Sequence, residues 1–281
     1  MKIKKAVILT AGFGTRFLPI TKVFPKALLP ICNKPIIHYL IEELIDSGIE
    51  NVTIVVKEAD SLIKKYFNDD EILNKYLISQ GKEKILNELK QINNQIKINY
   101  VVQEKKGSGG ALLAVKDLIN EPFIVVFCDD LMLGQIPATK QLIDAYLENG
   151  LMQIAALEIP KDKISRYGVL TYTSEGYVDS IIEKPNQITA ELKHAGIGRY
   201  LVTPDIFDYL LKANVQSNGE IYLPQTMFKM KDDGYKLNPV FVKTNYFDLG
   251  GQEGYLKANI YYGLKNNQLN QEINNFVKEE L

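Results

Sequence analysis

The stretch KKAVILTAGFGTRF, residues 4–17, decides the fold that the sequence predicts. Its apolar part, Lys5–Leu9, is a short continuous run, which is typical of a strand buried on both faces of a parallel sheet. A loop with two glycines, Gly12 and Gly14, follows directly and ends in Arg16. Glycine loops in this position let backbone N–H groups approach phosphate oxygens, and ligands of open α/β sheets lie at the carboxyl ends of the strands. The stretch therefore predicts the first strand of an α/β sheet and an anion-binding loop after it.

The glycine loop on its own does not identify the ligand. It is not a P-loop, because no Gly-Lys-Ser/Thr follows, and it departs from the dinucleotide fingerprint because Phe17 takes the place of the third glycine. An oxidoreductase that binds NAD here is therefore disfavoured. The prolines at 19, 25 and 30 exclude a regular helix directly after the loop and fix the path of a segment that carries Lys22 and Lys26.

Strands and helices alternate along the rest of the chain. A helical pattern opens at Pro35 and stops at Ser47 and Gly48, and a polar stretch from about 60 to 95 predicts two or three surface helices. Further strands are predicted at 52–56, 96–102, 122–127, 152–158, 168–173, 177–182, 195–202 and 236–243, and further helices at 109–119, 137–149, 205–212, 220–231, 252–265 and 269–281. This alternation predicts a single α/β domain with a doubly wound sheet.

Composition excludes several classes of protein. The chain has 281 residues, of which 46% are hydrophobic and 24% charged, so it is neither disordered nor fibrous. No apolar run approaches the roughly 18 residues that span a bilayer. The two cysteines, Cys32 and Cys128, lie in apolar surroundings and cannot build a disulfide framework, so we expect core thiols in a cytoplasmic protein.

Charge is distributed unevenly along the chain. Residues 1–41 contain seven basic residues and no acidic residue, although the formal net charge of the whole chain is −1. A basic surface face and an anion site both explain such a segment. Nucleic acid is disfavoured as a partner, because the overall balance is neutral and no basic patch alternates with aromatic residues.

Carboxylates occur where two strand-like runs end. Asp129 and Asp130 follow the run at 122–127, and Asp248 precedes a pair of glycines. Each is either a cap or a solvated loop residue, or a ligand for Mg²⁺ beside bound phosphates. Because the chain has only two histidines, a hard cation on carboxylates is the favoured kind of metal site. Asp129, Asp248 and the basic glycine loop together predict phosphoryl or nucleotidyl transfer.

The three arginines all adjoin glycine-containing turns, at Arg16, Arg166 and Arg199. Because lysine supplies the other positive charges, these arginines are candidates for bidentate anion contacts. Chance explains the placement of any one of them equally well.

Other polar residues give weaker signals. Lys184 is either a solvated lysine or a phosphate clamp, and its neighbour Glu183 can accept hydrogen bonds from paired sugar hydroxyls. We expect His38 to be packed in an apolar helix, and His194 has no obvious partner. No pair of side chains suggests a nucleophile with its base, so covalent catalysis is poorly supported.

Taken together, these motifs resemble the bacterial UTP–glucose-1-phosphate uridylyltransferases, also called UDP-glucose pyrophosphorylases, of the sugar nucleotidyltransferase family. The likeness spans residues 3 to about 265, in order and with compatible spacing, and the polar insert at 60–95 is also similar. It rests on Gly12-Phe13-Gly14-Thr15-Arg16, Pro25-Lys26, Leu29-Pro30, Asp129, Tyr167-Gly168-Val169, Glu183-Lys184-Pro185, Gly198-Arg199-Tyr200 and Gly219-Glu220-Ile221.

The resemblance implies a Rossmann-like nucleotidyltransferase fold, with a mixed, mostly parallel central sheet flanked by helices. It implies Mg²⁺-dependent transfer of a uridylyl group from UTP to glucose 1-phosphate, giving UDP-glucose and pyrophosphate. One nucleotidyltransferase domain is expected over 1–268, with a nucleotide-binding half at about 1–135 and a sugar-phosphate-binding half at about 136–268, before a C-terminal helix at 269–281. The expected partners are the two substrates and further copies of the chain, as a dimer or tetramer, with no nucleic acid and no membrane.

The resemblance also assigns roles to residues by matching position. The expected catalytic residues are Arg16, Lys26, Asp129 and Lys184. The expected nucleotide-binding residues are Ala11, Gly12, Gly14, Thr15, Gln103 and Gly109, of which the last two would read the uracil edge. The sugar phosphate would be held by Gly168, Glu183, Lys184 and Arg199, and Mg²⁺ by Asp129 and Asp248.

Three positions depart from the family pattern. Ala27 follows Lys26 where the family commonly has glutamate, Gly107-Ser108-Gly109-Gly110 stands for Gly-Leu-Gly-His, and Gln252 replaces a lysine. The first two lie near the expected base pocket, and the third leaves the phosphates one cation short. A glucose-1-phosphate thymidylyltransferase and a non-catalytic nucleotide-sugar-binding paralogue therefore stay open as alternatives.

Overall fold

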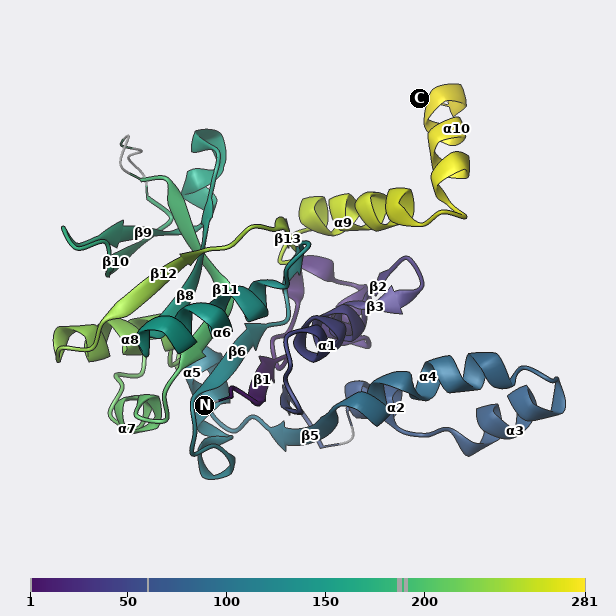
Figure 1. Ribbon diagram of the computed structural model, residues 1–281, viewed down its shortest axis with the longest axis horizontal. Helices are drawn as coiled ribbons and strands as arrows, with labels where there is room; N and C mark the ends of the chain where they lie inside the picture. The colour runs from purple at the N-terminus through teal and green to yellow at the C-terminus, as the bar shows by residue number, and fades with distance from the viewer. Residues whose placement is uncertain (1, 60, 186–188, 190–191, 281) are drawn as a thin grey trace.

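A nine-stranded mixed sheet forms the centre of the computed structural model, which describes residues 2–59, 61–185, 189 and 192–280 (Figure 1). Its parallel part has the order β6 (Phe123–Phe127), β1 (Lys5–Leu9), β4 (Asn51–Val56) and β5 (Lys97–Val102). Helices cover both faces of β1, which is why Val7 and Ile8 are fully buried. The carboxyl ends of these strands lead into the glycine loop, Gln103 and Asp129.

The second half of the chain extends the same sheet with mostly antiparallel pairs. β11 (His194–Val202) pairs with β6, with β8 (Met152–Glu158) and briefly with β9 (Gly168–Tyr172). β10 (Val178–Glu183) pairs with β9, and β12 (Leu237–Phe241) runs parallel to β8. The predicted fold class, an α/β fold with a mixed central sheet flanked by helices, is confirmed.

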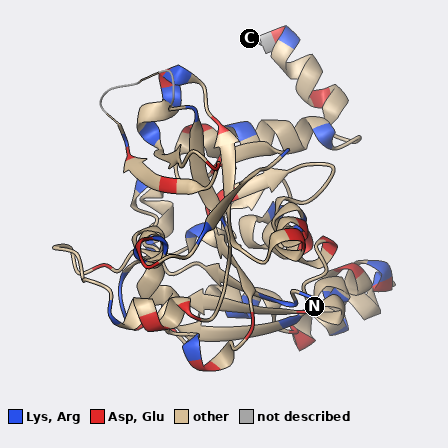
Figure 2. Ribbon diagram, turned by 60° about the vertical axis from the view of Figure 1, so that its left-hand side comes forward, with Lys and Arg blue, Asp and Glu red and all other residues tan. Residues whose placement is uncertain are grey.

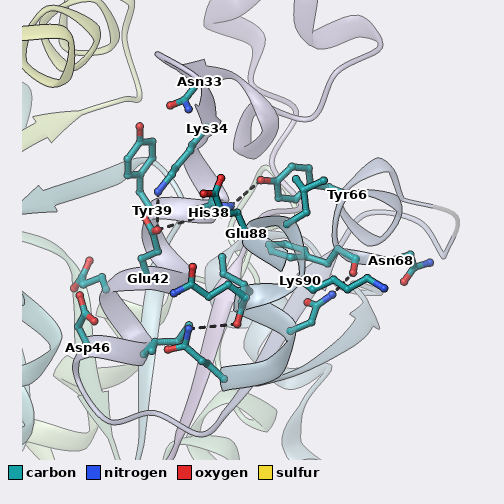
Figure 3. A pocket seen from close by; sticks show the side chains of 18 of the residues that line it. Asn33, Lys34, His38, Tyr39, Glu42, Asp46, Tyr66, Asn68, Glu88 and Lys90 are labelled. Carbon is teal, nitrogen blue, oxygen red and sulfur yellow. Dashed lines mark hydrogen bonds and ion pairs between the residues drawn. The ribbon is translucent and has the colours of Figure 1, made fainter. Parts of the chain in front are cut away.

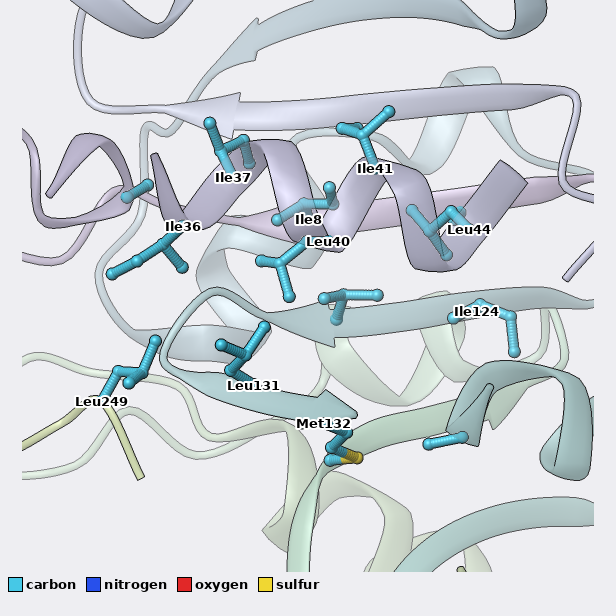
Figure 4. Close-up of a cluster of buried hydrophobic side chains, with 14 of the residues drawn as sticks. Ile8, Ile36, Ile37, Leu40, Ile41, Leu44, Ile124, Leu131, Met132 and Leu249 are labelled. Carbon is cyan, nitrogen blue, oxygen red and sulfur yellow. The ribbon is translucent and has the colours of Figure 1, made fainter. Parts of the chain in front are cut away.

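Ten α-helices lie around the sheet in the described part of the chain. They are α1 (Ile36–Asp46), α2 (Leu62–Phe67), α3 (Glu71–Ser79), α4 (Glu83–Gln95), α5 (Gly107–Leu113), α6 (Ala138–Asn149), α7 (Ile206–Leu211), α8 (Leu223–Asp232), α9 (Gln252–Lys265) and α10 (Asn270–Glu280). One core packs α1 and α6 against the sheet, and a second core packs α5, α7 and α8 (Figure 4 shows part of the first). The polar insert forms α2–α4, which project to one side in Figure 1.

A small ribbon joins the two halves of the chain next to the sheet. β7 (Asp130–Leu133) pairs antiparallel with β13 (Asn245–Asp248), and Asp248 lies opposite Asp130. Leu249, directly after β13, is fully buried and belongs to the same core cluster as Leu131 (Figure 4). This anchoring fixes the segment that carries Asp248. A second short ribbon pairs β2 (Pro30–Ile31) with β3 (Lys34–Pro35).

Some predicted boundaries differ from the structure. The helix expected at 109–119 begins two residues earlier and ends at Leu113, before a separate 3₁₀ turn at Lys116–Leu118. The helix expected at 220–231 begins only at Leu223, because the preceding residues form the turn at Gly219, where φ is +82°. The helix expected at 269–281 is α10, with Leu281 outside the described residues.

Basic and acidic residues are intermixed over the whole described chain, as the ribbon diagram in Figure 2 shows. None of the helices in the described part of the chain is long and apolar enough to cross a membrane. The division of the domain into two binding halves stays a prediction.

Candidate functional site

The glycine loop is fixed at its base and open at its tip. Thr10 donates a side-chain hydrogen bond to the Val55 carbonyl at 2.7 Å, which anchors the end of β1 to β4. Gly14 has φ of +60°, and a Cβ there would lie 3.2 Å from the Cβ of Lys26, so the position favours glycine. Gly12 has open space around it, since a Cβ would meet no atom within 4 Å. Backbone in the loop can therefore approach a ligand closely.

The predicted triphosphate-binding lysine touches the predicted metal ligand. Lys26 Nζ lies 2.9 Å from Asp129 Oδ2. The Lys26 side chain is 11% exposed, whereas that of Asp129 is 40% exposed. Lys26 begins a 3₁₀ turn after Pro25, and Asp129 follows β6, so the proline-rich segment holds its cation at the carboxyl end of the sheet.

Asp248 and Arg16 converge on the same place. Leu249 N–H donates to the Asp129 carbonyl at 2.8 Å, and Arg16 Nη1 donates to the Gly250 carbonyl at 3.2 Å. A Cβ placed on Gly250 would lie 2.6 Å from Asp248 Oδ1, 3.1 Å from Arg16 Nη1 and 3.6 Å from Asp129 Oδ2. The structure thus brings two carboxylates and two cations, from three distant parts of the sequence, around one place.

The donor set suits a divalent cation that also binds phosphate oxygens. Mg²⁺ is commonly held by one or two carboxylates together with substrate phosphates and water, rather than by a cage of protein ligands. Asp129 and Asp248 supply two carboxylates that lie near the same point, and Asp248 Oδ1 also accepts the Gly250 N–H at 2.8 Å. No group of three or more His, Cys, Asp or Glu side chains suited to a metal occurs among the described residues. The site therefore fits a metal that arrives with its nucleotide.

Asp130, the neighbour of Asp129, faces the interior. It is 9% exposed, its Oδ2 accepts the Gly198 N–H at 3.2 Å, and its Oδ1 accepts the Tyr246 hydroxyl. Burial, reinforced by the charge of Asp129, raises the pKa of Asp130 to about 7. The two adjacent aspartates are therefore in different environments, and only Asp129 is open to a ligand.

Arg199 corrects one expectation. Its side chain is 1% exposed and binds Glu43, with Nη2 to Oε2 at 2.7 Å and Nε to Oε1 at 3.2 Å. Glu43 also accepts the N–H and hydroxyl of Thr139. The predicted role of Arg199 in holding the sugar phosphate is wrong, because its guanidinium is enclosed in a buried ion pair that joins α1, α6 and β11.

The remaining predicted sugar-phosphate residues lie together where β9 and β10 meet. Glu183 pairs with Gly168 across these strands, and a Cβ on Gly168 would lie 3.0 Å from Glu183 Oε1. Lys184 is exposed, has φ of +45° and donates its backbone N–H to the Tyr167 carbonyl at 3.0 Å. The Tyr167 ring lies 6.4 Å from that of Tyr246, which connects this corner to the aspartates.

The loop expected to read the base is held by its own contacts. Gln103 Nε2 donates to the carbonyls of Lys105 at 2.6 Å and Gly107 at 3.2 Å. The Gly109 N–H donates to the Ile221 carbonyl at 2.8 Å. Gly109 is also buried, and a Cβ there would lie 2.7 Å from side chains of two neighbours. Gly109 therefore shapes the loop and its N–H is already engaged, and a role for Gly109 in reading the uracil edge stays a prediction.

The departures from the family pattern have local explanations. A Cβ on Gly110 would lie 2.3 Å from the Lys105 carbonyl, so this loop conformation excludes histidine there. Ala27 is fully buried. Gln252 Nε2 donates to the Arg16 carbonyl at 3.4 Å, so Gln252 supports the glycine loop without adding a charge. Arg166, one of the three arginines, binds Glu253 at 2.9 Å.

A cavity of about 1120 Å³ lies elsewhere, between α1 and the α2–α4 insert (Figure 3). Its lining includes none of the predicted site residues. His38 is packed there, with Nδ1 2.7 Å from the Tyr66 hydroxyl and Nε2 3.4 Å from Glu42.

His194 is partly buried, its Nδ1 has no hydrogen-bond partner among the described residues, and burial lowers its pKa. Cys32 and Cys128 are both free thiols.

Comparison with known proteins gives consistent results. The model of the nucleotidyl transferase family matches residues 5–263. A UTP–glucose-1-phosphate uridylyltransferase from Staphylococcus epidermidis is 39% identical, with 99% of this chain and 98% of the relative covered. A UTP-bound UGPase from Acinetobacter baumannii is 28% identical with a TM-score of 0.89, covering 99% and 100% of the two chains. A UDP-glucose pyrophosphorylase complexed with UDP-glucose is 34% identical with a TM-score of 0.82, covering 94% and 100%.

Proposed function

Because the chain belongs to the nucleotidyl transferase family, we propose that it catalyses the reaction of UTP with glucose 1-phosphate to UDP-glucose and pyrophosphate. It is a nucleotidyltransferase, and its curated relatives are named for this reaction over the whole length of the chain. One observation carries the proposal at the site. Arg16, Lys26, Asp129 and Asp248 converge at the carboxyl end of the parallel strands, next to an open glycine loop.

The residues suggest a division of labour. Arg16 and Lys26 would neutralise the triphosphate, while the backbone of Ala11, Gly12, Gly14 and Thr15 and the Gln103 segment would hold the nucleoside. On the other side, Gly168, Glu183 and Lys184 would hold glucose 1-phosphate. An oxygen of the sugar phosphate then attacks the α-phosphorus in line while pyrophosphate leaves, so positioning and charge neutralisation supply the catalysis and the protein provides no nucleophile.

We propose Mg²⁺ as the divalent metal. Asp129 and Asp248 would hold it, and the bound metal supplies charge neutralisation of the phosphates. A homodimer or tetramer and a cytoplasmic location stay proposals, the latter supported by the two free thiols.

A pyrophosphate-release assay tests the function. It crosses UTP, dTTP, CTP and ATP with glucose 1-phosphate in the presence of Mg²⁺. We expect turnover with UTP above all. Turnover with dTTP alone would make the chain a thymidylyltransferase, and tight UTP binding without turnover would make it a nucleotide-sugar-binding paralogue.

The contact between Lys26 and Asp129 predicts a coupling between metal and nucleotide. Substituting Lys26→Met removes a cation 2.9 Å from the carboxylate. We expect Mn²⁺ to bind the nucleotide-free variant at least about fivefold more tightly, since a charge pair at this separation contributes on the order of 1 kcal/mol or more. UTP should bind more weakly. Electron paramagnetic resonance measures free Mn²⁺, and calorimetry measures UTP; equal Mn²⁺ affinity in both proteins would contradict the coupling.

Lys184→Ala should act on one substrate. We expect the KM for glucose 1-phosphate to rise about tenfold or more, because a hydrogen bond to a charged group contributes roughly 1.5–3 kcal/mol. The KM for UTP should stay within about twofold, and Lys212→Ala, on an exposed lysine at the end of α7, serves as the control. Steady-state kinetics check both values. An equal loss for UTP would place Lys184 on the nucleotide instead.

A further inference from the structure

We propose that Asp130 and Tyr246 are positioning residues, which hold the two metal-binding aspartates in one arrangement without contacting the metal. The inference rests on the proposed function, because it assumes that Asp129 and Asp248 share a divalent cation. It concerns a carboxylate that the reaction itself does not use. Asp130 is buried, and each of its oxygens already accepts a hydrogen bond.

The hydrogen bonds of Asp130 reach the elements on both sides of the site. Tyr246 lies on β13, two residues before Asp248, and donates its hydroxyl to Asp130 Oδ1. Gly198, on β11 in the central sheet, donates its N–H to Oδ2 at 3.2 Å. The Asp130 side chain thus ties the ribbon that carries Asp248 to the central sheet. Asp130 also follows Asp129, the other metal-binding aspartate, directly in the sequence.

The same hydrogen bonds act on the register of the ribbon, together with the burial of Leu131 and Leu249 in the core. Asp248 lies opposite Asp130 in the β7–β13 pair, so the two face the same side of the ribbon. A two-stranded ribbon four residues long is marginal on its own, because it has few hydrogen bonds and little apolar area. A slip of one residue would turn Asp248 to the other face and out of the site. The Tyr246–Asp130 hydrogen bond opposes that slip.

The motif around Gly198 is built to admit Asp130. A Cβ on Gly198 would lie 2.1 Å from Asp130 Oδ2 and 2.5 Å from the Cβ of Phe127, so no other residue fits without movement. Arg199 Nη1 donates to the carbonyls of Gly198 at 3.0 Å and Phe127 at 3.5 Å. Its Nε and Nη2 bind Glu43. The Gly198–Arg199 pair therefore supports the aspartates from inside the protein, which gives a structural reason for a motif whose arginine is buried.

Tyr246→Phe tests the proposal with little risk to the fold, because it removes one hydroxyl and keeps the ring against Tyr167. Tyr39→Phe is the matched control. Tyr39, on α1, is partly buried and donates its hydroxyl to the Ile31 carbonyl at 2.9 Å. Three quantities are measured: the Mg²⁺ dependence of turnover, Mn²⁺ binding to the UTP-saturated protein by paramagnetic resonance, and the thermal midpoint. We expect Tyr246→Phe to weaken metal binding about tenfold in both metal measurements, as loss of the hydrogen-bonding groups around metal ligands typically does. Both variants should lower the thermal midpoint by a similar amount.

The outcomes separate this proposal from the proposed function. If Tyr246→Phe loses stability as Tyr39→Phe does and keeps wild-type metal binding, the hydrogen bond is merely structural and the positioning role is wrong. Asp130→Asn gives a second test, because it keeps the shape and leaves one of the two donors, Gly198 N–H or the Tyr246 hydroxyl, without an acceptor oxygen. It too should weaken Mn²⁺ binding. A wild-type protein that binds Mn²⁺ with UTP but shows no turnover would contradict the function and leave the metal comparison valid.

Discussion

Asp129→Asn should lower turnover about a thousandfold or more, because metal-assisted charge neutralisation contributes several kcal/mol and each 1.36 kcal/mol is a factor of ten. Asp129 is 40% exposed at the end of β6, so the core does not require its charge. The thermal midpoint should therefore stay near that of the wild type. The substitution also removes the negative charge that pairs with Lys26. The Lys26 ammonium group can then turn toward solvent or phosphate.

Initial rates at saturating substrates and a thermal melt check this expectation together. Asp144→Asn, which removes a partly exposed carboxylate on α6 that binds Lys140, is the control and should keep full turnover. Wild-type turnover in Asp129→Asn would remove Asp129 from the site. A collapse of the melt would show that the carboxylate serves the fold.

Arg199→Met should have the largest effect on stability. It leaves the buried Glu43 without its cation, and breaking a buried ion pair in this way typically costs about 3–5 kcal/mol. For a chain of this size the thermal midpoint should fall by roughly 10 °C. Differential scanning calorimetry measures the shift, and the KM for glucose 1-phosphate of the folded fraction should be unchanged.

The pair can be tested as a unit. Combining Arg199→Met with Glu43→Gln removes the unpaired charge and keeps an oxygen that can accept from Thr139, so it should recover much of the lost stability. A stable Arg199→Met protein with a raised KM for glucose 1-phosphate would instead restore the sugar-phosphate role that its burial excludes.

The sequence predicted most of the fold because its signals are local. The apolar run at Lys5–Leu9, the proline and glycine that bound α1, and the polar insert each determine an element through nearby residues. The ribbon of β7 and β13 was harder to predict. Its β7 is four residues long and directly continues the chain from β6, and its pairing joins residues more than a hundred positions apart.

The candidate site was predictable in part for the same reason. Carboxylates and glycines at the ends of apolar strands indicate a ligand, so Asp129 and the glycine loop could be found from pattern alone. Arg199 could not be assigned this way, because an arginine beside a glycine gives the same sequence pattern in two cases. It binds an anionic ligand in one case and a buried glutamate in the other, and here it binds Glu43 on α1. Tyr246 was missed because an aromatic residue in a strand-like run gives no sign that its hydroxyl bonds Asp130.

A crystal structure with UTP and Mn²⁺ tests the central claim most directly, since anomalous scattering places the metal independently of the protein. The account predicts one ion on the triphosphate, with oxygens of both Asp129 and Asp248 within about 2.1–2.3 Å of it and Lys26 moved from Asp129 to a phosphate. An ion bound without one of these two aspartates, or a triphosphate bound away from the glycine loop, would contradict it.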